Sequence, residues 1–170
     1  MKKQQGRRIM DQSGRRNIHL FAVILFLLSF NSAFAADDLA AVKQKFIGHW
    51  ELASYFTYPP QGGEVDMNYI GVLIYDELGN MNGQGMPVDL PERVAQSNER
   101  VSGGFAYWGT FDVDLDKEIV IHHVAGSAIR PQWVGGDNIR HYEFAGDTLA
   151  LSLKNGEGRT TAILTWRKVK

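Results

Sequence analysis

The sequence predicts an all-β protein: an eight-stranded antiparallel up-and-down β-barrel with a short helix ahead of its first strand. After residue 49, eight short runs rich in β-branched and aromatic residues follow one another, separated by turn residues. Most links between the runs are short, whereas parallel neighbours would need crossovers of about a dozen residues or more. Eight strands are also about the number that closes a sheet around one small ligand. A closed meander is therefore the expected fold.

Residues 1–35 have the pattern of a secretory signal peptide. Six basic residues and one acid precede an apolar stretch of 11 residues, 20–30, and Ala33-Phe34-Ala35 follows it. A membrane span needs roughly 20 apolar residues, so this stretch is too short to be one. We therefore expect cleavage after Ala35, a mature domain over residues 36–170 with no membrane span, and a periplasmic or secreted location. The pattern leaves open whether export follows the general or the twin-arginine route.

The charge and cysteine content of the mature domain exclude several classes of function. The whole chain has 18 basic and 19 acidic residues, and without the six and the one of the signal peptide 12 and 18 remain, a net charge of −6. Binding to a nucleic-acid backbone relies on clustered lysine and arginine, so we expect no nucleic-acid partner. The absence of cysteine excludes disulfides, thiolate metal sites and a cysteine nucleophile. The mature length suits one domain with one core.

A short helix is expected directly after the cleavage site. Asp37 and Asp38 stand at its start, lysines lie late in the segment 39–47, and Gly48 follows, which is the usual order of helix start and stop signals. The apolar residues of this segment fall on one face, so we expect the helix to close one end of the barrel. These residues are Leu39, Val42, Phe46 and Ile47.

The first four predicted strands cover residues 50–57, 68–75, 80–86 and 105–113. Two prolines and two glycines within residues 58–63 end the first strand. The second strand is rich in Tyr, Ile and Val, and a turn with Asp and Gly leads from it into the third. The link before the fourth strand is long and polar. Within this link we expect residues 92–97 to form a helical turn over the barrel mouth.

The last four predicted strands cover residues 119–125, 138–144, 148–153 and 159–168. An acid-rich turn, residues 114–118, precedes them, and a longer loop follows the first of the four. Two tight turns containing glycine with Asp or Asn then join the last three strands. Such turns are typical of hairpins, which favours antiparallel pairing between sequence neighbours.

At the start of the first strand, Gly48 and Trp50 resemble the opening signature of lipocalins. Longer stretches resemble the bacterial lipocalin-like domain family, and the similarity runs from about residue 46 to the end of the chain. These stretches are residues 71–75 with 79–81, 107–114, 120–126, and 133–135 leading into Arg140 and 144–151. The resemblance implies a small stand-alone barrel in which Arg167 packs over Trp50. It assigns no activity, because a fold does not fix a function.

His122 and His123 are the candidate catalytic residues. Adjacent residues of a strand point to opposite faces, so one histidine faces the lumen and the other does not, and the pattern leaves open which. His141 lies on the following strand and is able to approach either one, which allows a two-histidine metal or haem site. No third ligand has helpful spacing, so we expect no metal and no cofactor.

Aromatic residues with polar tips and one arginine are the candidate ligand-binding residues. A ligand cavity provides hydrogen-bond partners for buried O–H and N–H groups. Arg140 lies in the middle of a strand, where an inward guanidinium would bind a carboxylate and an outward one would pair with Glu143 or Asp112. Arg130 is expected at the rim. The candidates are Tyr55, Tyr75, Tyr107, Trp108, His123, Trp133, Arg140 and Tyr142, and because Tyr107 and Trp108 are adjacent, at most one of these two lines the lumen.

The hypothesis that these patterns favour is an exported barrel that binds a small, apolar or amphipathic molecule in its lumen. An alternative is a cofactor-free isomerase or cyclase in which a lumen histidine acts as acid and base. A haem-binding barrel is a further alternative. The sequence leaves open the identity of the ligand, whether catalysis occurs, and the oligomeric state.

Overall fold

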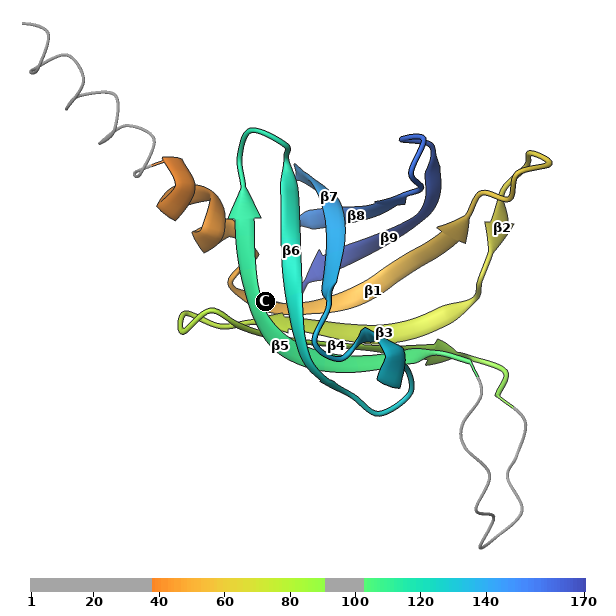
Figure 1. Cartoon of the computed structure of the whole chain (residues 1–170), viewed down its shortest axis with the longest axis horizontal. Helices are drawn as coiled ribbons and strands as arrows, with labels where there is room; N and C mark the ends of the chain where they lie inside the picture. The colour runs from red at the N-terminus through yellow and green to blue at the C-terminus, as the bar shows by residue number, and fades with distance from the viewer. Residues whose placement is uncertain (1–37, 91–102) are drawn as a thin grey trace, which may run out of the picture. The chain divides into compact units, whose positions relative to one another are not determined.

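The computed structural model describes residues 38–90 and 103–170 and contains a closed antiparallel barrel (Figure 1). The sheet order is β2-β1-β3-β4-β5-β6-β7-β8-β9, and a further pairing between β1 and β9 joins its edges. Because β2 has only two residues and pairs with the end of β1, eight strands form the barrel wall, as predicted. The strands are β1 (Gly48–Thr57), β2 (Val65–Asp66), β3 (Tyr69–Tyr75), β4 (Asn80–Pro87), β5 (Phe105–Asp114), β6 (Ile119–Ser127), β7 (Asp137–Ala145), β8 (Thr148–Lys154) and β9 (Thr160–Lys168).

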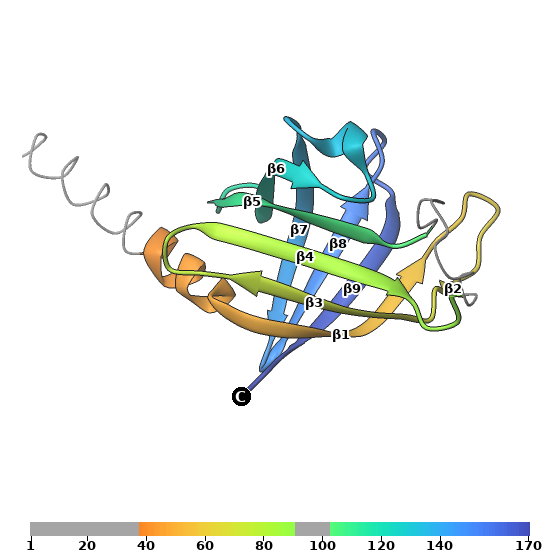
Figure 2. The same cartoon turned by 90° about the horizontal axis from the view of Figure 1, so that it is seen from below.

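The arrangement of the strands is an uninterrupted meander. Strands β1, β3 and β4 lie side by side on one side of the barrel, and β7, β8 and β9 lie side by side on the other (Figure 2). The structure adds β2 and a short 3-10 helix, η1 (Pro131–Trp133), which are too short to show a hydrophobic period in the sequence.

Two of the sequence predictions fall on segments that the structure does not describe. The predicted signal peptide, residues 1–35, and the predicted helical turn, residues 92–97, lie outside the described residues. Within the ranges 38–90 and 103–170, no helix combines the length and the apolar character that a bilayer crossing requires.

Phe46 closes one end of the barrel, as the sequence predicts for the helix that carries it. Residues 38–46 are helical, and residues 41–170 form one compact unit. The Phe46 side chain is fully buried, which stabilises the fold by about 2–3 kcal/mol. Its carbonyl oxygen accepts a 2.8 Å hydrogen bond from Nε1 of Trp50. Its ring lies 4.9 to 6.1 Å, between centroids, from the rings of Tyr75, Phe111, Tyr142 and Phe144.

The cation over Trp50 is Lys168, which corrects the role that the family resemblance implied for Arg167. In the pairing of β1 with β9, Trp50 stands opposite Lys168, whose Nζ lies 4.9 Å from the Trp50 ring centroid. Arg167 precedes Lys168 in β9 and therefore points to the other face. There its guanidinium lies 4.0 Å from the carboxylate of Glu51. The register of β9 is the physical reason for the difference.

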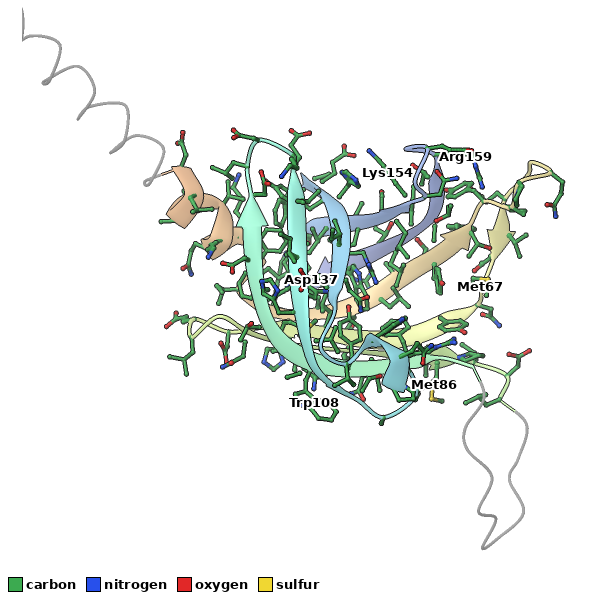
Figure 3. The ribbon with its side chains drawn as sticks, viewed as in Figure 1. Met67, Met86, Trp108, Asp137, Lys154 and Arg159 are labelled. Carbon is green, nitrogen blue, oxygen red and sulfur yellow. The ribbon has the colours of Figure 1, made fainter. Side chains whose placement is uncertain are left out.

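Alternation along β5 and β6 separates an interior face from an outer face. On β6, Val120, His122 and Val124 are buried, whereas on β5 Trp108 is 50% exposed. Figure 3 shows the Trp108 side chain directed away from the barrel. Opposite Trp108, strand β6 has a bulge at Ala125. The Trp108 ring lies so close to Gly126 that any β-carbon at Gly126 would collide with it. Trp108 is therefore part of the outer surface.

Candidate ligand-binding cavity

The half of the barrel remote from Phe46 is hollow. Phe46 contacts one end of β3 at Tyr75, whereas Tyr69 at the other end lines a cavity of about 140 Å³. The cavity walls come from strands on both sides of the barrel and from η1. Most of the lining side chains are aromatic or aliphatic, and they are Tyr55, Tyr69, Leu73, Phe105, Tyr107, Trp133, Leu151, Leu153, Leu164 and Trp166.

Two arginines from different elements line the same cavity. Arg140 on β7 points inward, which decides between the two orientations that the sequence allowed. Arg130 stands just before η1, where its backbone N–H donates a 3.0 Å hydrogen bond to Oγ of Ser127. Its guanidinium lies 5.9 Å from the centroid of the Trp133 ring. Within the described residues the cavity lining contains no Asp or Glu, so the charge of the lining is positive.

His122 is buried between two tyrosines, behind the part of the cavity wall that Tyr107 forms. The Tyr75 hydroxyl lies 2.7 Å from His122 Nε2, and the Tyr107 hydroxyl lies 2.8 Å from Nδ1. Burial lowers the pKa of His122 well below its usual value, and the nearby Arg140 guanidinium lowers it further. His122 is therefore a neutral imidazole at pH 7, with both ring nitrogens engaged. Burial also raises the pKa of both tyrosines, so their hydroxyls stay protonated.

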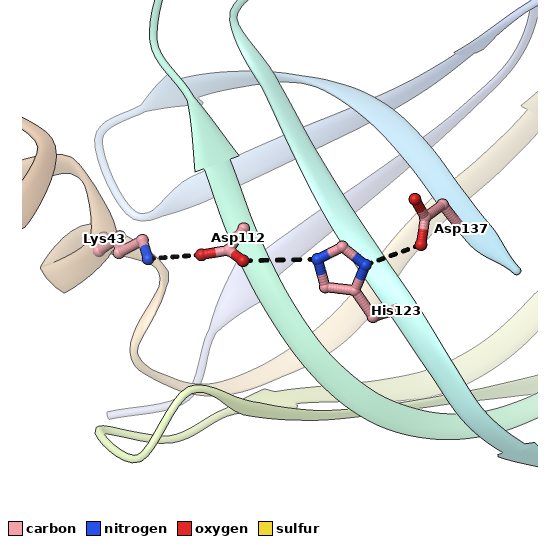
Figure 4. Close-up of polar contacts among 4 residues, drawn as sticks. All are labelled: Lys43, Asp112, His123 and Asp137. Carbon is pink, nitrogen blue, oxygen red and sulfur yellow. Dashed lines mark hydrogen bonds and ion pairs between the residues drawn. The ribbon is translucent and has the colours of Figure 1, made fainter. Parts of the chain in front are cut away.

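His123, the next residue, lies on the outer face in a line of charged groups (Figure 4). Its Nδ1 lies 2.7 Å from a carboxylate oxygen of Asp137, and its Nε2 lies 3.4 Å from Asp112. Lys43 lies 2.8 Å from the other carboxylate oxygen of Asp112. The hydrogen bond to Asp137 raises the pKa of His123, and Asp112 adds to this effect. The pKa of Asp112 is lowered, mainly by its hydrogen bond with Lys43.

The structure brings half of the predicted ligand-binding residues together. Tyr55, Tyr107, Trp133 and Arg140 line the cavity. Tyr75 stands behind it as the partner of His122, and Tyr142 packs against Phe46 at the closed end. The candidates Trp108 and His123 lie on the outer face, because strand alternation gives the inward positions to Tyr107 and His122.

Trp166 is the most informative lining residue that the sequence analysis missed. It is buried on β9, and Ala162 and Leu164, which precede it at intervals of two, are buried as well. This period-two pattern was visible in the sequence and marks an inward face. The aliphatic lining residues Leu151 and Leu153 on β8 follow the same rule.

Neither candidate catalytic histidine lines the cavity. His122 reaches it only through the hydroxyl of Tyr107, and His123 faces outward. His141 alternates with the inward Arg140 and so lies on the face opposite to His122, which means that these two histidines cannot share an iron or another metal ion. Among the residues that the structure describes, no group of three or more His, Asp or Glu side chains is arranged to hold a metal ion.

Comparison with known proteins identifies a family whose model matches most of the chain. The family model described as a lipocalin-like domain matches residues 47–169. Among solved structures, the chain is similar to a lipocalin-like protein from Bacteroides uniformis ATCC 8492, with 16% identity and a TM-score of 0.43, over 74% of this chain and 99% of that one. It is also similar to an uncharacterized protein from Bacteroides eggerthii DSM 20697, with 14% identity and a TM-score of 0.42, over 73% and 99%. No curated protein matches the sequence.

Proposed function

We propose that this chain, which belongs to the lipocalin-like domain family, binds one small, largely apolar molecule inside its barrel. The observation that carries the proposal is the hollow half of the interior, with its aromatic and aliphatic lining. Small-molecule sites are concave and mostly apolar, with a few polar groups that fix orientation. Here those polar groups are Arg130, Arg140 and the Tyr107 hydroxyl.

The volume of the cavity limits the size of the ligand. An apolar cavity of about 150 Å³ holds one benzene molecule, and this cavity measures about 140 Å³. The part of the ligand that enters is therefore about the size of one ring, and a longer molecule leaves its remainder outside. Each 100 Å² or so of apolar surface removed from water contributes about 2.5 kcal/mol. Affinity then depends on how completely the ring is enclosed.

A titration with toluene tests the proposal. We expect saturable chemical-shift changes in the NMR spectrum of the protein, concentrated at Tyr55, Leu153 and Trp166. A Leu153→Trp variant fills the cavity, so it should lose this response. The matched control is Ile139→Trp on the outer face, which should keep it, because Ile139 is 49% exposed. An absence of saturable binding by the wild-type protein, or unchanged binding by a folded Leu153→Trp variant, would refute the proposal.

We propose further that the protein is exported to the periplasm or secreted. The support is the order of basic residues, apolar stretch and Ala33-Phe34-Ala35 at the start of the chain. N-terminal sequencing of protein recovered from the periplasm or culture medium of producing cells should begin at Ala36. Uncleaved chain confined to the cytosol would contradict this assignment.

A further inference from the structure

We propose that the ligand is a ring-sized organic acid whose carboxylate is bound by Arg130 and Arg140. This inference rests on the proposed function and names the chemical class of the molecule that the cavity takes. Four observations support it: the missing acidic partners of the two arginines, two unpaired N–H donors, the position of the Arg140 charge, and the direction of the Tyr107 hydroxyl.

Neither cavity arginine has an acidic partner within the ranges 38–90 and 103–170. The guanidinium of Arg140 donates a 2.8 Å hydrogen bond to the carbonyl oxygen of Ile139, and no carboxylate faces it from the cavity lining. A charge that leaves water without a partner costs free energy, and an anion beside it recovers that free energy. The ion pairs of the described residues involve other positively charged side chains, which are Lys43, Lys117, His123, Arg167 and Lys170.

Two buried nitrogens in the lining residues also lack partners. Nε of Arg130 and Nε1 of Trp166 are buried and make no hydrogen bond within the described part of the chain. Both groups donate and neither accepts. Buried polar groups in native proteins are nearly always paired, with protein, water or ligand. A carboxylate has only acceptor oxygens and therefore complements this set of donors.

The charge of Arg140 acts across the width of the cavity. Burial raises the pKa of Tyr107, and the Arg140 guanidinium opposes this rise. Burial and then Tyr69 raise the pKa of Tyr55 on β1, and Arg140 and Arg130 both oppose that rise. The two tyrosines lie on different strands, so the positive potential extends over the space between them.

The hydrogen bonds of His122 direct the Tyr107 hydroxyl toward the cavity. Tyr75 is 1% exposed, and within the described residues its hydroxyl has only His122 as a partner, so Tyr75 donates to Nε2. A neutral imidazole with an accepting Nε2 carries its proton on Nδ1. Nδ1–H therefore donates to the Tyr107 oxygen, which leaves the Tyr107 O–H free to donate to a ligand. Tyr107 is thus a third donor beside the two arginines.

Three matched probes test the inference: benzoate, its neutral analogue benzamide, and toluene. We expect benzoate to bind at least about tenfold more tightly than benzamide at low salt, because charge-assisted hydrogen bonds are the stronger ones. This ratio should shrink as salt is added. Binding of toluene and benzamide with no preference for benzoate would overturn the inference and leave the proposed function standing. If none of the three binds, the proposed function itself fails.

Two arginine variants, one on the inner face of the barrel and one on the outer face, test the role of Arg140. Arg140→Met should lower the affinity for benzoate by about tenfold and leave that for toluene within about twofold. The control, Arg167→Met, removes an outward arginine and should leave both unchanged. Equal effects of the two variants would overturn the inference. The ligand series on wild-type protein needs no variant, so the test does not depend on how well Arg140→Met folds.

The role of Tyr107 has a spectroscopic test of its own. The nitrogen resonances of the His122 ring should report a neutral imidazole with its proton on Nδ1. Tyr107→Phe should lower the affinity for benzoate several-fold with little effect on toluene. A proton on Nε2, or equal losses for both probes, would remove Tyr107 from the proposed carboxylate site.

Discussion

Strand β6 gives the barrel two adjacent histidines with opposite chemistry. His122 points inward, is fully buried, and has both ring nitrogens bonded to neutral tyrosine hydroxyls. His123 points outward, with 41% of its side chain exposed, between the carboxylates of Asp112 and Asp137. Burial lowers the pKa of the first, and the Asp137 hydrogen bond raises the pKa of the second. The face of the sheet, and not the residue type, decides what each imidazole does.

The largest expected difference between the two positions is in stability. His122→Ala leaves the hydroxyls of Tyr75 and Tyr107 unpaired and opens a void, so it should lower the free energy of unfolding by about 3–5 kcal/mol. His123→Ala, the matched control, should cost less than about 1 kcal/mol, since exposed ion pairs contribute little. Urea unfolding at pH 7 measures both. Similar losses for the two variants would contradict the comparison.

The pH dependence of stability should reveal His122 next. The unfolded chain protonates this residue below a pKa of about 6.5, whereas the folded protein does not, because its pKa is well below that value. The stability from His122 is therefore present above pH 6.5 and is lost as the pH falls, by about 1.4 kcal/mol per pH unit. The difference between the wild-type and His122→Gln unfolding curves from pH 7 to pH 5.5 isolates this effect. Parallel curves would show that His122 does not bind protons differently in the two states.

His123 should respond to pH with the opposite sign and a smaller amplitude. Its folded pKa is raised, so its contribution is fully present below pH about 6.5 and is lost as the pH rises through the folded pKa. An NMR titration should place the pKa of His123 above that of a free histidine. Asp137→Asn should bring it back down, because Asp137 is the main cause of the rise. An unchanged titration in that variant would assign the shift elsewhere.

The smallest expected effect is that of Lys43, at the far end of the outer line of charges. Its ion pair with Asp112 is 2.8 Å long but partly exposed on both sides. Lys43→Met should change the free energy of unfolding by no more than about 0.5 kcal/mol, and less in high salt. A loss above about 1 kcal/mol in chemical denaturation would mean that the outer line stabilises the barrel in a way that exposed ion pairs do not.

Much of the fold follows from local sequence. The ends of the eight long strands agree with prediction to within about two residues, because glycine, proline and Asp or Asn turns mark most of them. The closing role of Phe46 was also visible, since its helix has one apolar face. The short strand β2 could not be predicted, because two residues are too few to show an alternation of apolar and polar residues.

The composition of the cavity was harder to predict, and the reason lies in β6. Its two alternating sets are both apolar: Ile119 and Ile121 beside His123, Val120 and Val124 beside His122. Hydrophobic alternation identifies the inner face of a strand only where one of the two sets is polar. The sequence of β6 therefore did not show which histidine faces inward. The pairing of β6 with β5 also shifts register between Trp108 and Gly109, because Ala125 on β6 has no partner there.

By itself, the sequence determined the class of fold, the order and limits of the long strands, and the family, because these depend on short-range period and turn chemistry. Only the tertiary structure decided that His122 and Arg140 face inward and that Lys168 covers Trp50. Those outcomes depend on pairing between distant segments: the hydroxyl that meets Nε2 of His122 comes from Tyr75, 47 residues earlier in the chain. A shift of one residue in the register of any strand exchanges its two faces. The register of the closed barrel therefore determines which side chains line the interior.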